Sequence, residues 1–124
     1  MHRHPETDAM LGAVAAFLRE VCAPALVGRD AFLARVAANA VEIAAREARE
    51  GPAAVKAEAD ALKTLMGRSE GDLEDLRAAL CAQIISGERD ADDPALLDTL
   101  LTIAVRRVRL EQPAYASLER APCA

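Results

Sequence analysis

Apolar residues recur along most of the chain at spacings of three and four, which places them on one face of an α-helix. The clearest runs are Leu11, Val14, Leu18 and Val21, then Val55, Ala59, Leu62 and Leu65, then Leu73, Leu76, Leu80 and Ile84. Glycine, proline and aspartate separate these runs, and such residues begin or end helices. The pattern predicts an all-α fold, a single-domain bundle of about five helices over residues 1–124.

The boundaries of the first helices follow from these separating residues. The first helix opens near Thr7, whose hydroxyl can cap it, and fades at Ala23-Pro24. Gly28 breaks the chain and Asp30 caps the second helix. The pair Gly51-Pro52 ends that helix and starts a third, because glycine suits the position after a helix and proline suits a first turn. We therefore expect a tight corner between the second and third helices.

The later boundaries are read in the same way. A loop over Gly67–Gly71 ends the third helix, and Asp72 caps the fourth. A second loop over Gly87–Asp92 leads to Asp93-Pro94, a cap followed by a first-turn proline, and Pro113 ends the fifth helix.

The two ends of the chain are expected to contribute little. Residues 1–6 and 119–124 are predicted to fray, because termini without packing are poorly ordered. Within the segment after Pro113, Tyr115 and Leu118 are the side chains expected to dock on the bundle.

The second and fifth helices carry apolar residues over a wider arc than the usual single stripe. On the second helix the arc includes Phe32, Leu33, Val36, Ala37, Ala40, Val41, Ile43 and Ala44. We expect this helix to be central. On the fifth helix it includes Leu96, Leu97, Leu100, Leu101, Ile103, Val105, Val108 and Leu110. That helix either lies inside the bundle or meets a second subunit, so a homodimer is a possible assembly.

Composition narrows the classes of protein. Apolar residues make up 52% of the chain, charged residues 28% and aromatic residues 2%, and the net charge is −5. This is a globular composition, and its negative charge and lack of stacking side chains argue against nucleic acid as a partner. Ala9–Leu18, an uncharged run as long as any in the chain, is too short to span a membrane, and no signal-peptide pattern precedes it. We expect a cytoplasmic protein.

Cysteine and histidine give no sign of a metal or catalytic centre. Cys22, Cys81 and Cys123 are far apart and are expected to be reduced thiols. His2 and His4, the only histidines, lie at the terminus, where an incidental pair is more common than a metal site. A histidine-dependent nucleophile is therefore not expected, and neither is a cofactor or a bound metal.

Two loops superficially resemble ligand-binding motifs. The acidic residues Glu88, Asp90, Asp92 and Asp93 lack the glycine and glutamate of a calcium loop, so they are interpreted as a helix-capping loop. The segment Gly67–Gly71 lacks the strand and the Gly-Lys-Ser/Thr ending of a phosphate loop.

One polar stripe on the second helix is a candidate site. Arg35, Asn39, Glu42, Arg46 and Arg49 fall at helical spacing. Arginine guanidinium groups there can bind a carboxylate or a phosphate. The simpler interpretation, which we favour, is a solvated face with a Glu42 to Arg46 ion pair and with Asn39 bonded to a backbone or a neighbouring helix.

Several stretches resemble a bacterial family of small helical domains of unknown function. They are Arg29–Ala40, Glu50–Pro52, Leu80-Cys81, the Gly87–Leu97 segment and Gln112–Tyr115. The resemblance implies association with aminoglycoside-phosphotransferase-like kinases and acyl-CoA dehydrogenase-like enzymes, near which such domains are encoded. It brings no catalytic residues, although Arg35 and Asn39 match its recurring Arg-Val-Ala-x-Asn pattern.

The sequence thus leads to a non-catalytic accessory or protein-interaction domain, associated with a kinase-like or dehydrogenase-like partner. The alternative is a small-molecule binding protein in which Arg35, Asn39, Glu42 and Arg46 hold an anionic ligand such as a carboxylate, a phosphate or a coenzyme A derivative. An enzyme using Arg35, Glu42 or Arg46 is a third possibility, but the sequence shows no paired acid-base geometry for it.

Overall fold

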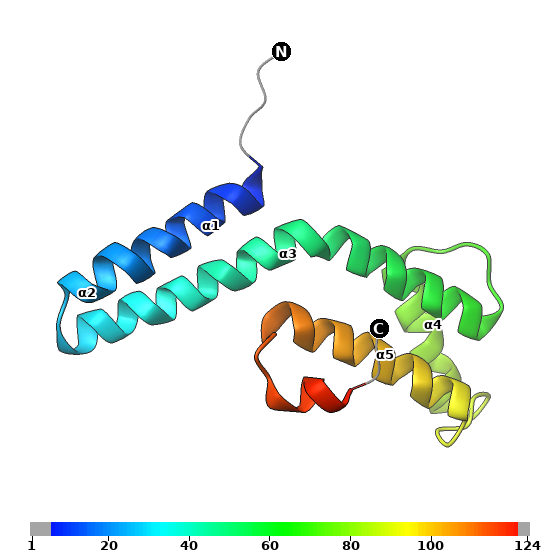
Figure 1. Cartoon of the computed structure of the whole chain (residues 1–124). Helices are drawn as coiled ribbons and strands as arrows, with labels where there is room; N and C mark the ends of the chain where they lie inside the picture. The colour runs from blue at the N-terminus through cyan, green and yellow to red at the C-terminus, as the bar shows by residue number, and fades with distance from the viewer. Residues whose placement is uncertain (1–5, 122–124) are drawn as a thin grey trace, which may run out of the picture. The chain divides into compact units, whose positions relative to one another are not determined.

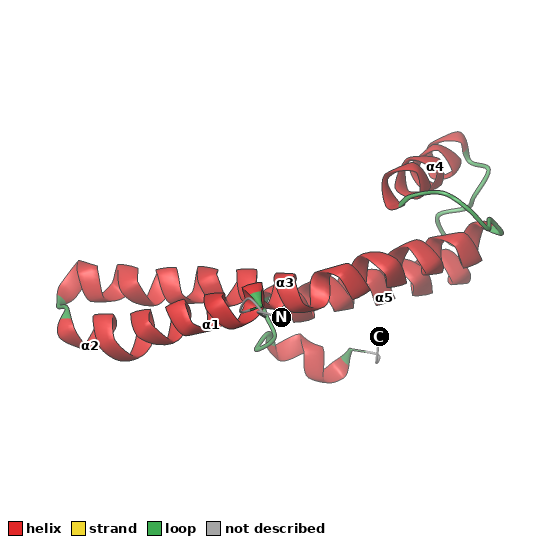
Figure 2. Cartoon of the chain, turned by 90° about the horizontal axis from the view of Figure 1, so that it is seen from above, coloured by secondary structure: helices red, strands yellow, loops and turns green. Residues whose placement is uncertain are grey.

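The computed structural model describes residues 6–121, and every regular element in that range is helical, which confirms the all-α prediction (Figure 2). The elements are α1 (Thr7–Phe17), a π-helix η1 (Leu18–Cys22), α2 (Ala23–Ala25), α3 (Gly28–Met66), α4 (Leu73–Ser86), α5 (Pro94–Glu111) and a 3-10 helix η2 (Ala116–Arg120) (Figure 1). Contacts divide the chain after Gly51 into two compact units. We call them the N-terminal and C-terminal units; α3 contributes to both.

The prediction of a corner at Gly51-Pro52 is wrong, because α3, which is 39 residues long, continues through both residues. Pro52 has no N–H to donate to the carbonyl of Ala48, and its ring crowds that carbonyl. Strong helix formers lie on both sides, alanine, glutamate and arginine before the pair and alanine, lysine and glutamate after it, and they continue the helix past this weak point. The two residues instead mark the boundary between the units.

The N-terminal unit is a helical hairpin in which α1, η1 and α2 run antiparallel to the first part of α3 (Figure 1). Among its described residues the buried side chains are all alanines, namely Ala15, Ala23, Ala31, Ala34, Ala38 and Ala45. Four of them lie on α3 at helical spacing and form one face of that helix. Small side chains at the contact let the two helical backbones approach closely.

The first helical segment extends past the expected end at Ala23-Pro24 and reaches Ala25. The N–H of Ala23 donates to the carbonyl of Leu18, which is the wider hydrogen bond of a π-helix. Pro24 has no N–H and cannot donate to the carbonyl four residues earlier. The widened turn lies just before this missing α-helical hydrogen bond.

Two predicted caps in this unit are wrong. Glu6, rather than Thr7, is the residue before α1, and no side chain caps that end. Gly28, whose φ of 59° suits glycine, starts α3, so Asp30 lies within the first turn. Asp30 there still opposes the positive end of the helix dipole.

The second predicted helix is not central. Of its large apolar side chains, Phe32 is 57% exposed, and Leu33 and Val36 are each 44% exposed. The reason is that the hairpin supplies one neighbouring helix, which covers only the alanine face of α3.

The C-terminal unit has a leucine core. Leu62 from α3, Leu76 and Leu80 from α4, and Leu96 from α5 form one buried cluster. Ala59, Leu65, Met66, Leu73, Ile84 and Ile103 pack around it. Helix α4 and the second part of α3 therefore bury most of their predicted faces, although Val55 is 52% exposed. Of the wide arc predicted on α5, Leu97, Leu100 and Leu101 stay 39–53% exposed.

The helix ends of this unit also match the sequence. The Asp72 side chain accepts a hydrogen bond of 2.9 Å from the N–H of Asp75, and that of Asp93 accepts one from Ala95. Gly87 ends α4 in the left-handed conformation, with a φ of 79°. Helix α5 ends at Glu111, shortly before Pro113.

Candidate functional site

The predicted polar stripe lies on α3 within the N-terminal unit, and two of its members are bonded to η1. Arg19 Nη2 donates to Asn39 Oδ1 at 2.7 Å, and Arg19 Nε donates to Glu42 Oε1 at 3.1 Å. The Arg19 and Glu42 side chains are 41% and 40% exposed, so this ion pair lies at the surface. Arg19, which sequence reasoning did not assign, thus connects the two sides of the hairpin.

The remaining members of the stripe are arginines. Arg35 is exposed, and among residues 6–121 it forms no ion pair. Arg46 is partly buried and takes part in an interaction of its own, while Arg49 lies 3.6 Å from Glu50. The contact of Asn39 with a neighbouring helical segment agrees with the interpretation that we favoured. A ligand at Arg35, Asn39, Glu42 and Arg46 stays a prediction.

The acidic loop before α5 serves as a cap. Asp90 accepts a hydrogen bond from the N–H of Asp92, and Asp93 caps α5. Within the described residues no group of three or more histidine, cysteine or acidic side chains is placed to hold a metal ion. His2, His4 and Cys123 lie outside those residues. Cys22 and Cys81 are free thiols.

Arg89 in the same loop was also missed by sequence reasoning. Its guanidinium donates to Gln83 Oε1 at 3.1 Å, to Asp93 Oδ2 at 3.4 Å and to the carbonyl of Leu65 at 3.2 Å. These partners come from α4, from the cap of α5 and from the end of α3, so one side chain fastens three helices together. Only the three-dimensional arrangement brings Leu65 within reach.

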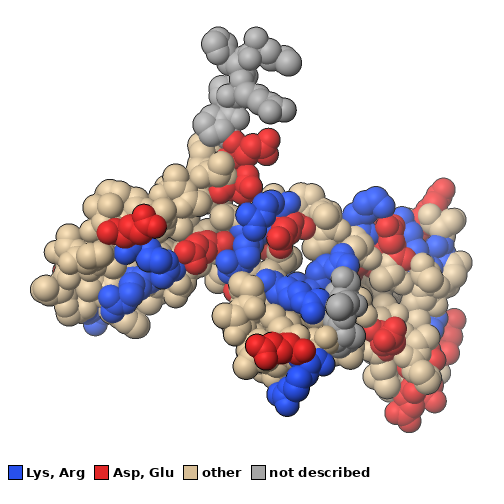
Figure 3. All heavy atoms as spheres, viewed as in Figure 1, with Lys and Arg blue, Asp and Glu red and all other residues tan. Residues whose placement is uncertain are grey.

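The N-terminal unit exposes a row of large apolar side chains on the other helical segment. Met10, Val14, Phe17 and Val21 follow one another at spacings of four, three and four, and each is 48–55% exposed. We call this row the apolar stripe. The turn after it adds Leu26 and Val27, which are 41% and 84% exposed. Figure 3 shows how much of the surface of this hairpin is uncharged.

Small uncharged residues surround the apolar stripe. Ala9, Gly12, Ala13 and Ala16 complete the circumference of α1, and no charged residue lies between Ala9 and Leu18. Helix α1 is therefore uncharged all round over most of its length. In the hairpin, however, only the side that carries Ala15 is buried.

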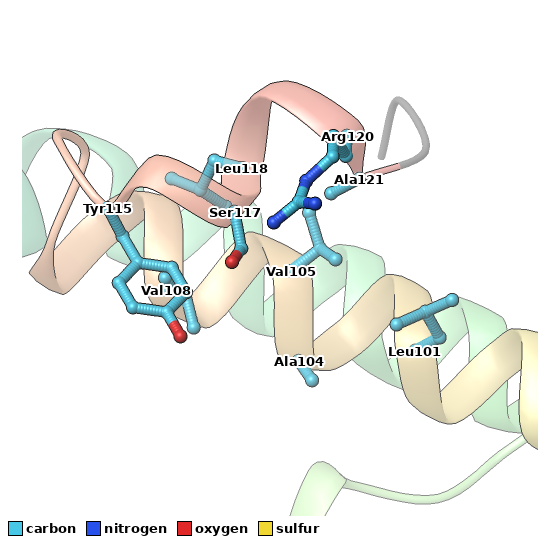
Figure 4. A pocket seen from close by; sticks show the side chains of 9 residues that line it. All are labelled: Leu101, Ala104, Val105, Val108, Tyr115, Ser117, Leu118, Arg120 and Ala121. Carbon is cyan, nitrogen blue, oxygen red and sulfur yellow. The ribbon is translucent and has the colours of Figure 1, made fainter.

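The C-terminal unit contains a separate cavity of about 370 Å³ between α5 and the segment after it (Figure 4). Leu101, Ala104, Val105 and Val108 form its floor on α5, and Tyr115, Ser117, Leu118, Arg120 and Ala121 line its other side. Of the two side chains predicted to dock on the helices, Leu118 is partly buried and Tyr115 is 53% exposed, and the segment contacts α5 through η2. Glu119 and Arg120, which were expected to fray, lie in η2.

None of the described helices has the length and apolar character needed to span a membrane.

Comparison with known proteins gives one match. Residues 24–115 match the model of a protein family described as a domain of unknown function, DUF6285. No curated protein and no solved structure matches the chain. The matched residues include α3, α4 and α5, and they begin after the apolar stripe.

Proposed function

The chain belongs to the DUF6285 family, and from this premise we propose that it is a non-catalytic protein-interaction domain whose binding surface is the apolar stripe. The observation that carries the proposal is that α1, from Ala9 to its end at Phe17, is uncharged around its whole circumference but covered on one side only. A helix that is apolar all round is normally buried on all sides. The unburied side of α1 therefore calls for a second contact.

The exposed area is large enough to matter. Six partly exposed side chains, those of the apolar stripe with Leu26 and Val27, present on the order of 500 Å² of apolar surface. That value lies at the upper end of what the largest patch on a monomeric protein covers, about 300–600 Å². Phe17 at its centre is the kind of side chain that anchors an interface.

The spacing of the stripe indicates what kind of partner fits. Side chains separated by four, three and four residues form the seam of a helix that packs along another helix. Alanine and glycine beside the seam allow a close approach. We propose an α-helical segment of another protein as the occupant, and the kinase-like and dehydrogenase-like enzymes implied by the resemblance are the partners to test first.

A photo-crosslinking amino acid in place of Phe17 tests this proposal, with the same probe at Ile85 as the matched control. Ile85 is 86% exposed and lies on α4, outside the apolar stripe. We expect the probe at position 17 to join the chain to one other polypeptide in fixed stoichiometry, and the probe at position 85 to join it to none. Mass spectrometry of the product separates a different protein from a second copy of the chain.

A substitution makes the same test without the probe. Phe17→Glu should abolish the complex and leave the circular dichroism melting curve unchanged, whereas Ile85→Glu should preserve the complex. Crosslinks from position 17 only to residues of the same chain would show that the stripe is covered internally, and that result would overturn the proposal. A crosslink only to a second copy would replace the helical partner with a homodimer.

A further inference from the structure

The cavity of the C-terminal unit has the chemistry of a site for a small amphipathic molecule, independently of the apolar stripe. Its volume of about 370 Å³ lies within the range of small-molecule sites, roughly 300–1,000 Å³. The floor comes from one face of α5, since Leu101, Ala104, Val105 and Val108 are spaced by three, one and three residues. Leu118 closes the opposite side, so an aliphatic group inside meets methyl and methylene groups on both sides (Figure 4).

Three side chains supply the polar groups of the cavity. They are the hydroxyls of Tyr115 and Ser117 and the guanidinium of Arg120. In Figure 4 the Arg120 side chain extends back from the end of η2 toward Ser117, above Val105. The guanidinium of Arg120 and the hydroxyl of Ser117 therefore lie near each other, whereas the hydroxyl of Tyr115 is not directed toward them.

The charge of Arg120 is not neutralised by the described part of the chain. Within residues 6–121 no carboxylate forms an ion pair with its guanidinium, and Glu119, its neighbour in the sequence, forms none either. A guanidinium without a carboxylate partner favours an anionic group, because a hydrogen bond between two ionised groups is stronger than one between neutral groups.

The number of donors limits the charge of the ligand. One guanidinium presents a planar pair of N–H groups, which matches the two oxygens of a carboxylate. A doubly charged phosphate has a second charge and further oxygens, and the lining offers no second cation to pair with them. We propose that this cavity binds a monocarboxylate with an aliphatic chain, with Arg120 holding the carboxylate and the α5 face holding the chain.

Octanoate is a suitable probe, and octan-1-ol, octylammonium and acetate are its matched controls. Backbone amide shifts in NMR titrations of the full chain report both affinity and location. We expect octanoate to bind at least tenfold more tightly than octan-1-ol or acetate, with the largest shifts at Val105 and Leu118. Octylammonium should bind more weakly than octan-1-ol, because Arg120 repels it.

Substitutions locate the anion. Arg120→Gln should weaken octanoate binding about tenfold and leave octan-1-ol binding unchanged. Arg120→Glu should reverse the preference, so that octylammonium binds better than octanoate. Arg68→Gln, at an exposed arginine in the loop after α3, is the matched control and should change neither. Both positions are exposed, so these variants should fold.

Filling the cavity tests the apolar half of the site. Ala104→Phe should block both octanoate and octan-1-ol while preserving the helical circular dichroism spectrum. Equal affinity for octanoate and octan-1-ol in the unsubstituted chain would overturn the proposal. So would an equal effect of Arg68→Gln and Arg120→Gln, or shifts that map away from α5 and η2.

Discussion

The two units of this chain fold by the same helical periodicity and bury opposite kinds of side chain. The C-terminal unit buries Leu62, Leu76, Leu80 and Leu96 together and surrounds them with partly buried apolar side chains. The buried side chains in the described part of the N-terminal hairpin are all alanines, while its larger side chains, such as Phe17, Val27 and Phe32, are more than half exposed. The hairpin therefore buries small side chains and exposes large ones, whereas the unit that follows it has a core of leucines.

This difference indicates how much free energy of folding each unit gains from the side chains that it buries. Full burial of a leucine side chain contributes about 1.5–3 kcal/mol, and an alanine methyl contributes far less because stabilisation follows the apolar area removed from water. The C-terminal unit adds the three-way contacts of Arg89 and the paired hydrogen bonds of Arg77 to Glu58, one of which measures 2.9 Å. The hairpin has the exposed ion pair of Arg19 and Glu42, which contributes little at a surface.

The largest expected effect tests the leucine core. Leu76 is 1% exposed, and Leu76→Ala should lower the free energy of unfolding by about 2–5 kcal/mol, since it removes buried methyl groups and leaves a cavity. Urea unfolding followed by circular dichroism measures this change. A loss well under 1 kcal/mol would mean that the C-terminal unit is not the better packed of the two.

A substitution at the boundary between the units is expected to have the next largest effect on stability, and it should raise the stability instead of lowering it. Pro52→Ala restores an N–H that can donate to the carbonyl of Ala48 inside α3. It should raise the stability of the chain by about 1–3 kcal/mol. Amide hydrogen exchange around residues 48–56 should slow at the same time. Faster exchange there would indicate that proline is favoured at this position.

A substitution in the apolar stripe should change stability far less than Leu76→Ala. Phe17 is 55% exposed, so Phe17→Ser in the isolated chain should change the free energy of unfolding by about 0.5 kcal/mol or less. Thermal unfolding at low protein concentration is the measurement. A loss comparable with that of Leu76→Ala would mean that Phe17 is buried in the isolated chain, and the contrast between the units would fail.

The smallest effect concerns pH. Lys56 Nζ lies 2.8 Å from Asp60 Oδ2 on α3, and its hydrogen bond and charge lower the pKa of the Asp60 carboxyl. A carboxyl with a lowered pKa in the folded state adds stability above its unfolded pKa of about 3.9, and the contribution is lost as the pH falls through the folded pKa. Asp60→Asn should therefore slightly flatten the pH dependence of the urea midpoint below about pH 4. An unchanged curve would show that this exposed pair contributes nothing.

The features that could be predicted from the sequence are the local ones. Three helix ends are determined by bonds to residues close in the chain, at Asp72, Gly87 and Asp93. The residue types at each of these boundaries were therefore enough to predict the helix end. Gly51-Pro52 gave an equally strong local signal, but the helix-forming residues on both sides outweighed it. Residues of low helix propensity weaken a helix locally, but they do not by themselves end it.

The features that could not be predicted depend on what lies opposite each face. Periodicity placed side chains such as Phe32 and Val36 in the apolar arc of α3, but it gave no number of neighbouring helices, so both were expected inside and are 57% and 44% exposed. The polar stripe was found in the same way, whereas its partner Arg19 comes from another helical segment. Side chains that meet across helices leave no regular spacing along the chain.

The alanine face of the hairpin has a consequence for which substitutions the chain tolerates. At Ala38, which is 0% exposed, the limit is volume, so serine or glycine fits and leucine would push the helices apart. Phe17 is 55% exposed, so the hairpin limits its volume far less, and a bound partner would require an apolar side chain there. Random mutagenesis selected for folding alone should therefore restrict the inner positions to small residues and leave the outer positions unrestricted. A second selection, for complex formation, would restrict the outer positions by polarity.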